Sequence, residues 1–222
     1  MADQSADITW RDDKTPVSTQ FDDPYFSVVN GLAETRHVFL SGNDLPERFA
    51  QGFHIAELGF GTGLNALAAW QAWRDAGQGG DLHFTSFEAF PMRAPDMASA
   101  LAAFPEVADM AAQMMAALQG GPRVALPGLR LEVVQGDARA TLPDWAGRAD
   151  AWFLDGFSPA KNPELWGADL MREVANHTAA HGTFATYTAA GFVRRGLEAA
   201  GFEVRRAQGF GRKRHMSRGR LA

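Results

Sequence analysis

The chain has 222 residues, 46% of them hydrophobic, which is enough for one substantial domain with a buried core. It contains no cysteine, which excludes disulfides, zinc–thiolate sites and cysteine nucleophiles. Its six histidines lack metal-binding spacing, so we expect no metal. No apolar run approaches the length of a membrane span, and the first residues do not resemble a signal peptide. We therefore expect no membrane association and a cytoplasmic location.

The net charge of −5 conceals an asymmetry along the chain. Residues 1–203 carry 14 Lys and Arg against 26 Asp and Glu, a net charge of −12, whereas residues 204–222 carry seven Lys and Arg and no acid, a net charge of +7. A basic segment on an acidic body is either a solvated terminal strand or a contact for phosphates. Charge alone leaves both interpretations open.

Residues 1–50 lack helical periodicity. Short alternating or aromatic pieces are separated by turn residues, so we predict strands or hairpins that lie over the edge of the domain. These pieces cover residues 8–10, 17–21, 25–27 and 37–40. We interpret residues 1–50 as an N-terminal β-rich extension and residues 51–222 as a single globular domain.

From residue 53 onward, strand and helix patterns alternate, which is typical of a doubly wound α/β sheet. Predicted strands cover residues 53–58, 82–88, 129–135, 150–155 and 182–187, followed by a pair at 202–207 and 215–221. Predicted helices cover residues 62–75, 96–104, 106–119, 169–178 and 189–200. In the last helix, we expect one buried face, formed by Phe192, Gly196, Leu197 and Ala200. The sequence therefore predicts a mostly parallel seven-stranded sheet.

The residues Phe-His-Ile-Ala-Glu-Leu-Gly-Phe-Gly-Thr-Gly-Leu-Asn at 53–65 predict a buried strand, a glycine-rich turn and the start of a helix near Thr62. Glycines at 59, 61 and 63 permit positive φ or the close approach of a ligand, and the unpaired N–H groups of the helix point into the same space. The spacing differs from the dinucleotide fingerprint G-x-G-x-x-G. Glu57 would repel a pyrophosphate but suits a ligand that carries an ammonium and a sulfonium, such as S-adenosylmethionine. The alternative is a turn without a ligand.

Four acids lie where predicted strands end, at the edge where a doubly wound sheet binds its ligand. Glu57 ends the first of these strands, and Glu88 is placed to accept hydrogen bonds from ribose hydroxyls. Asp137 is placed for an adenine amino group, and Asp155 should face whatever lies beyond the methyl group. Together with the glycine turn, these acids indicate a methyltransferase-type cofactor site.

Asp155 opens a loop, residues 155–163, that two prolines stiffen. Its acid, aromatic and proline are similar to the (Asp/Asn)-Pro-Pro-(Tyr/Phe) loop of amino-methylating enzymes. Phe157 is suited to stack on a base or to face a cationic amine. The alternative is that Phe157 caps the core.

With these residues in place, the chain resembles the methyltransferase of the MnmC/MnmD family, which modifies the wobble uridine of certain transfer RNAs. The resemblance runs from about residue 25 to residue 216, and its segments are residues 25–27, 30–39, 57–65, 152–163, 189–197 and 209–214. Ala-Lys-Asn-Pro at 160–163 and Gly-Phe-Gly-Arg-Lys-Arg at 209–214 are not generic to methyltransferases. These two pieces therefore carry the family assignment.

The resemblance implies a Rossmann-like class I fold and methyl transfer from S-adenosylmethionine to the exocyclic amine of 5-aminomethyl-(2-thio)uridine. The product would be 5-methylaminomethyl-(2-thio)uridine at the wobble position of tRNA, and we expect contact with the anticodon arm. The flavin-dependent oxidoreductase domain of bifunctional members has no counterpart in these 222 residues. A separate oxidoreductase would then supply the aminomethyl precursor.

The sequence and the resemblance together predict three sets of site residues. Cofactor binding is expected at Glu57, Gly59, Phe60, Gly61, Thr62, Gly63, Asn65, Glu88, Asp137, Ala138 and Asp155. Substrate binding is expected at Phe26, Asn30, Phe157, Lys161, Arg212, Lys213 and Arg214. Asp155 is the expected catalytic residue, which binds the amine, orients its lone pair and helps to remove a proton.

Two other functions remain open from the sequence. A methyltransferase of a small-molecule amine would share the cofactor residues but would not bind RNA. A catalytically silent module on the same fold would bind RNA without turnover. A nicotinamide oxidoreductase is disfavoured by the glycine spacing.

Overall fold

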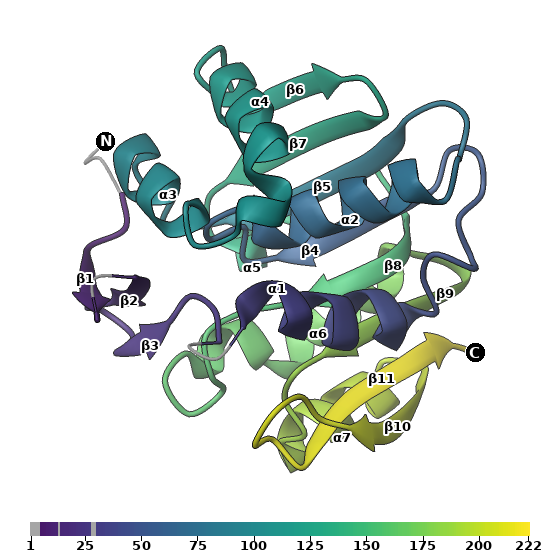
Figure 1. The fold of residues 1–222 in the computed structure, drawn as a ribbon. Coiled ribbons are helices and arrows are strands. Elements are labelled where there is room, and N and C mark those ends of the chain that lie inside the picture. The colour runs from purple at the N-terminus through teal and green to yellow at the C-terminus, as the bar shows by residue number, and fades with distance from the viewer. Residues whose placement is uncertain (1–4, 13, 28–29) are drawn as a thin grey trace.

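The computed structural model describes residues 5–12, 14–27 and 30–222. The main sheet (Figure 1) consists, in chain order, of β4 (His54–Leu58), β5 (Leu82–Glu88), β6 (Arg123–Leu126), β7 (Leu129–Gln135), β8 (Ala149–Leu154), β9 (Thr178–Thr186), β10 (Phe202–Gln208) and β11 (His215–Leu221). Its spatial order is β10-β11-β9-β8-β4-β5-β7-β6. The central strands β9, β8, β4, β5 and β7 are parallel to one another, whereas β6, β10 and β11 pair in antiparallel fashion at the two edges. The predicted fold class and the pairing of the last two strands are confirmed.

The main sheet has eight strands, so the predicted number of seven is wrong. The additional strand is β6, which forms a hairpin with β7 in which Leu126 stands opposite Leu129. Only Val124 of its four residues is buried, and the strand follows Gly-Gly-Pro at 120–122. A segment with one buried side chain after a glycine-rich turn has no alternating pattern long enough to indicate a strand.

Helices cover both faces of the sheet, with α2 in front of it and α6 and α7 behind it in Figure 1. The helices are α1 (Gly31–Thr35), α2 (Leu64–Asp75), α3 (Ala94–Leu101), α4 (Ala108–Leu118), α5 (Ala138–Thr141), α6 (Ala168–Asn176) and α7 (Gly191–Ala199). Short 3-10 turns at Ser41–Asn43, Pro105–Val107 and Pro163–Trp166 and a π-helical turn at Arg36–Leu40 complete the helical segments. None of the helices within the described ranges is long and apolar enough to cross a membrane.

Side chains on the central strands alternate between the two faces of the sheet. Ile55 and Phe153 pack in the cluster that contains residues of α2, α3 and α4. Ala56 and Trp152 pack in the cluster that contains residues of α6 and α7. All four side chains have 0% exposure, so the sheet is buried on both sides at its centre. This is the usual environment of parallel strands, and it holds their carboxyl ends in fixed positions.

The predicted buried face of α7 is wrong for one residue. Val193 and Leu197 have 0% exposure, whereas Phe192 is 46% exposed. The helix begins at Gly191, and the i, i+4 pair Val193 and Leu197 defines the face that meets the sheet. Phe192 lies one residue before that face and points to solvent.

The N-terminal residues form a small antiparallel sheet of β1 (Ile8–Arg11), β2 (Thr15–Ser18) and β3 (Asp23–Pro24). The strand predicted at residues 8–10 is confirmed, and the one predicted at 17–21 is confirmed only at its start. Residues 25–27 form a bend that follows β3, so the strand predicted there is wrong.

The strand predicted at residues 37–40 is also wrong, because Arg36–Leu40 continues α1 as a π-helical turn. Asn30 caps α1, and its Oδ1 accepts a hydrogen bond of 2.9 Å from the backbone N–H of Ala33. Val38, Phe39 and Leu40 are all buried. Burial of three successive side chains overrides the strand propensity of this apolar run.

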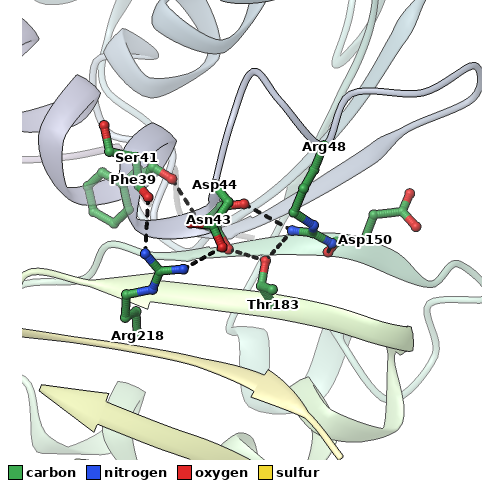
Figure 2. Close-up of polar contacts among 8 residues, drawn as sticks. All are labelled: Phe39, Ser41, Asn43, Asp44, Arg48, Asp150, Thr183 and Arg218. Atoms are coloured by element: carbon green, nitrogen blue, oxygen red, sulfur yellow. Dashed lines mark hydrogen bonds and ion pairs between the residues drawn. The ribbon is translucent and has the colours of Figure 1, made fainter. Parts of the chain in front are cut away.

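A buried polar cluster joins this N-terminal helical segment to the sheet (Figure 2). Asn43 has 0% exposure; its Nδ2 donates to the carbonyls of Phe39 at 2.9 Å and Trp152 at 3.3 Å, and its Oδ1 accepts from Thr183 Oγ1 at 2.6 Å. Arg48 donates to the Asn43 carbonyl at 3.0 Å and to the Asp150 carbonyl at 3.1 Å. These bonds connect residues 39–48 to β8 and β9.

Replacing Asn43 with alanine should lower the free energy of unfolding by about 2–4 kcal/mol, because three hydrogen bonds are removed where water cannot replace them. Urea unfolding followed by tryptophan fluorescence measures this change. Asn176→Ala, at the exposed end of α6, is the matched control and should change stability by less than about 0.5 kcal/mol. Equal stability of the two variants would contradict a stabilising role for the cluster.

Candidate active site

The glycine turn at residues 59–63 connects β4 to α2, and all three glycines have positive φ, at 93°, 54° and 77°. The helix starts at Leu64, two residues after the predicted start, with Gly63 as its N-cap. A Cβ on Gly59 would stand 2.3 Å from the carbonyl oxygen of Asp155. The turn therefore packs backbone to backbone against the loop that follows β8, which only glycine allows. Phe60 and Thr62 are buried, at 6% and 4% exposure.

Glu57, at the end of β4, has 0% exposure. Its Oε1 accepts a hydrogen bond of 2.8 Å from Asn65 Nδ2, and its Oε2 accepts one of 2.6 Å from Ser86 Oγ. Burial raises the pKa of Glu57 well above its usual range, although both hydrogen bonds act to lower it. Glu57 thus lies beneath the turn and holds Asn65, and it has no surface free for a ligand.

The Asn65 side chain joins two carboxylates to the N-terminal segment. Besides its bond to Glu57, its Nδ2 donates to Asp155 Oδ2 at 2.6 Å, and its Oδ1 accepts from Thr35 Oγ1 at 2.7 Å. Because ionised carboxylates only accept hydrogen bonds, the amide nitrogen of Asn65 faces the two acids, and its oxygen is left to accept from the Thr35 hydroxyl. Thr35 was not predicted as a site residue: it lies within the segment 30–39, but no local pattern indicates its contact with Asn65.

Glu88 ends β5 and holds the glycine turn from the neighbouring strand. It is 9% exposed; Oε2 accepts from the N–H of Gly61 at 2.9 Å, and Oε1 accepts from the N–H of Phe90 at 2.8 Å. Burial raises the pKa of Glu88, and the backbone hydrogen bonds oppose this rise. Each carboxylate oxygen keeps a further lone pair, which suits a ribose hydroxyl.

Asp137 follows β7 and lies near Glu88, because the N–H of Gly136 donates to the Glu88 carbonyl at 2.9 Å. Its carboxylate caps α5 by accepting from the N–H of Arg139 at 2.9 Å, and it pairs with the Arg139 side chain. The hydrogen bond from the Arg139 side chain lowers the pKa of Asp137. Ala138, the first residue of α5, is buried at 4% exposure.

Asp155 follows β8 and is partly buried beside the turn. Burial raises its pKa to about 7; Asn65 and Lys213 act to lower it, and Glu34 raises it further. A carboxyl group that titrates near neutral pH is suited to proton transfer under physiological conditions. Asp155 is thus held in place by Asn65 and has a raised pKa.

Lys213, Glu34 and Tyr187 come from distant parts of the chain and meet beside Asp155. Lys213 Nζ lies 2.9 Å from Glu34 Oε1 and 4.1 Å from the centre of the Tyr187 ring. The Tyr187 hydroxyl donates to the carbonyl of Gly156 at 2.8 Å. Burial raises the pKa of Tyr187, and the nearby Asp155 adds to the rise. Neither Glu34 nor Tyr187 was predicted, since their role depends on pairing across the whole chain.

The loop at residues 155–163 is tied to the small N-terminal sheet. Phe157 stacks on Phe21 with ring centres 4.8 Å apart and meets Tyr25 edge-on at 5.1 Å. Lys161 pairs with Asp22 at 3.0 Å, and the N–H of Ser158 donates to an Asp23 oxygen at 2.8 Å. These contacts cover the loop and occupy the ammonium of Lys161.

The remaining predicted substrate residues divide into two groups. Phe26 packs edge-on against Phe104 with ring centres 5.0 Å apart, and Asn30 serves as the cap of α1. Arg212 and Arg214 are exposed in the turn between β10 and β11. The structure therefore holds Glu88 against the glycine turn, joins Asn65 to Asp155, sets Lys213 near Asp155 and leaves Arg212 and Arg214 exposed on either side of Lys213.

The charge of the acids around the glycine turn fits a cationic nucleoside ligand. Within the described part of the chain, no ion pair joins Lys or Arg to Glu57, Glu88 or Asp155. Burial raises the pKa of all three acids because it disfavours their charged forms, and a positively charged ligand would favour those forms. Bound S-adenosylmethionine would supply a methyl group activated by a positive sulfur. Among the residues that the structure describes, no group of three or more His, Asp or Glu is placed to hold a metal ion.

Replacing Asp155 with asparagine should stabilise the cofactor-free protein more at alkaline pH than at acid pH. The folded pKa is about 7, whereas the unfolded value is about 4. The protonated carboxyl therefore contributes stability that is complete below the unfolded pKa and is lost as the pH rises through the folded pKa. Asparagine has no such proton to lose. We expect its advantage over the wild type to grow by about 1–3 kcal/mol between pH 5 and pH 8.

Urea unfolding at several pH values without cofactor measures this difference. Asp75→Asn, at the exposed end of α2, is the control and should show no such trend. An advantage of Asp155→Asn that does not change with pH would contradict the raised pKa.

Comparison with known proteins supports the resemblance seen in the sequence. The family model of S-adenosyl-L-methionine-dependent methyltransferases matches residues 102–222. The chain is 47% identical to the tRNA 5-methylaminomethyl-2-thiouridine biosynthesis bifunctional protein MnmC of Chromobacterium violaceum, over 100% of this chain and 35% of that protein. It is 48% identical to the protein of the same name from Ectopseudomonas mendocina, over 97% of this chain and 35% of that protein. The chain thus spans about a third of the length of these curated relatives.

Solved structures agree with this assignment. The fold matches MnmC2 from Aquifex aeolicus with a TM-score of 0.81 and 25% identity, over 98% of this chain and 70% of that chain. Spermidine synthase from Thermotoga maritima matches with a TM-score of 0.56 and 9% identity, over 97% of this chain and 71% of that chain, which shows a shared fold alone. The chain belongs to the family of S-adenosyl-L-methionine-dependent methyltransferases, and within it to the branch that contains the methyltransferase domain of MnmC.

Proposed function

We propose that this chain transfers a methyl group to the exocyclic amine of 5-aminomethyl-(2-thio)uridine at the wobble position of tRNA, giving 5-methylaminomethyl-(2-thio)uridine. The proposal depends on the position of Asp155. Its carboxylate lies beside the glycine turn, accepts a hydrogen bond from Asn65 and has no basic ion-pair partner among the described residues. The names of the two MnmC relatives refer to the biosynthesis of this nucleoside.

Methyl transfer to an amine depends on positioning and on a neutral nitrogen. Holding the two reactants in line converts an encounter in solution into a step with a high effective molarity. An alkyl amine has a pKa near that of lysine, about 10, so it is mostly protonated at neutral pH. Asp155 binds this ammonium, accepts a proton from it and turns the freed lone pair toward the methyl group.

The other residues of the site hold Asp155 and the ligand in place. Asn65 fixes the Asp155 carboxylate through its 2.6 Å bond, and Thr35 fixes Asn65. Glu88 accepts hydrogen bonds from the ribose hydroxyls, and Asp137 faces the adenine amino group. The glycine turn supports the amino acid end of the cofactor.

The proposal includes a partner and a location. The anticodon arm of tRNA is the substrate, and the exposed Arg212 and Arg214 contact its phosphates. A flavin-dependent oxidoreductase that acts on the same tRNA supplies the aminomethyl group. The protein acts in the cytoplasm, where tRNA is modified.

Incubation with labelled S-adenosylmethionine and bulk tRNA that carries unmethylated 5-aminomethyluridines tests the proposal. Digestion and mass analysis should find the label in 5-methylaminomethyl-(2-thio)uridine. Asp155→Asn, matched in size, should incorporate label about 10²–10⁴-fold more slowly because the base is removed. Cofactor binding without labelled nucleoside would overturn the RNA substrate and favour a small-molecule amine.

Glu88→Gln should weaken S-adenosylmethionine binding by about 1.5–3 kcal/mol, roughly 10- to 150-fold, because a charged acceptor becomes neutral. Titration calorimetry measures the affinity. Glu106→Gln, on the exposed surface near α4, is the control and should bind like the wild type. Unchanged affinity in Glu88→Gln would remove Glu88 from the cofactor site.

A further inference from the structure

Phe192 is an exposed aromatic residue for which packing gives no explanation. Among the described residues it is the one large hydrophobic side chain that is exposed, at 46%. It lies in the segment 189–197, which carries part of the family resemblance. In that segment, Val193 and Leu197 have 0% exposure and account for the attachment of α7 to the sheet.

A basic side chain lies beside Phe192. Arg195 is exposed and lies one helical turn further on, which places it beside Phe192 on the helix surface. Its guanidinium reaches back over the start of α7, because a Cβ built on Gly191 would stand 3.0 Å from Arg195 Nη1. An exposed aromatic ring next to a guanidinium combines a stacking surface with a phosphate contact.

Strand register places Phe192 at the same edge of the sheet as Asp155. Phe153 of β8 stands opposite Ala185 of β9, so Asp155 and Tyr187 follow at the same level. Phe192 comes five residues after Tyr187, which limits the distance between their Cα atoms to about 18 Å.

The basic hairpin tip extends beyond the same edge. Ser217 of β11 stands opposite Thr186 of β9, so the turn that carries Arg212 and Arg214 continues past the end of β9. No ion pair of either arginine is found within the described residues, whereas Lys213 between them is bound to Glu34. The carboxyl edge of the sheet that carries Asp155 thus also carries an exposed aromatic residue and, within the described residues, two arginines without an ion pair.

We propose that Phe192 is the stacking surface for an unpaired base that neighbours the modified nucleotide, with phosphate contacts from Arg195, Arg212 and Arg214. This inference rests on the proposed tRNA substrate and adds how the loop is held. A nucleoside presented in a single-stranded loop must be separated from its neighbours to reach Asp155. Stacking of an adjacent base on Phe192 replaces the base–base stacking that this separation breaks.

Binding of an anticodon stem-loop RNA to wild-type protein and variants tests the inference. Phe192→Ala should raise the Kd roughly 5- to 150-fold, as expected when the stacking of one base is removed. Phe192→Trp should keep the wild-type affinity, and Phe192→Leu, similar in size and apolar but without a π-face, should bind as weakly as the alanine variant. The unfolding midpoint and the Kd for S-adenosylmethionine report on folding, and both should be unchanged because the side chain is exposed.

The salt dependence of binding separates stacking from phosphate contact. Phe192→Ala should keep the slope of log Kd against log salt, whereas Arg212→Gln and Arg214→Gln should each reduce it by about 1. Wild-type affinity in Phe192→Ala or in Phe192→Leu would overturn the stacking role. Failure of the wild-type protein to bind the RNA would instead overturn the proposed tRNA substrate.

Discussion

One amide side chain links the parts of this methyltransferase that form its active site. Asn65 belongs to the first turn of α2, and its nitrogen donates to Glu57 of β4 and to Asp155 after β8, while its oxygen accepts from Thr35 of α1. A primary amide has two N–H donors and one carbonyl acceptor, and all of them are used here. The Asp155 carboxylate therefore cannot rotate without breaking its bond to the same amide that holds the buried Glu57 beneath the turn.

The electrostatics of the site follow from the same arrangement. Neutral donors stabilise Glu57, Glu88 and Asp155, and within the described residues none of the three has a basic ion-pair partner. Hydrogen bonds from neutral groups offset only part of the cost of burying a carboxylate, so the pKa values of these acids remain raised. A positively charged ligand would stabilise the ionised forms of these acids, whereas an anionic ligand would destabilise them.

Much of the fold, and the placement of the acids at one edge of the sheet, could be predicted from the sequence. The alternation of apolar strands and amphipathic helices after residue 53 has a strong periodicity, and parallel strands place their carboxyl ends together, so Glu57, Glu88 and Asp155 could be assigned to one edge. The burial of Glu57 could not be predicted in this way, because its two hydrogen bonds come from Asn65 of α2 and Ser86 of β5.

Other contacts have no local signal in the sequence. The run at residues 37–40 has strand propensity but becomes helical because three successive side chains are buried. Glu34 meets Lys213 across 179 residues, and Asn43 meets Thr183 across 140. Lys161 and Lys213, whose substrate-binding role stays a prediction, likewise form ion pairs with acids that no local pattern indicates.

The ion pair between Glu34 and Lys213 has a consequence for how the enzyme forms. Loop-closure entropy makes contacts between distant residues late events in folding, and a ribosome presents the N-terminal part of a chain first. The contact between Glu34 of α1 and Lys213 can therefore form only after β9 and the hairpin of β10 and β11 are in place. A nascent chain that contains the complete glycine turn would still lack the contacts of Lys213 with Glu34 and Tyr187, which form only after that hairpin is synthesised.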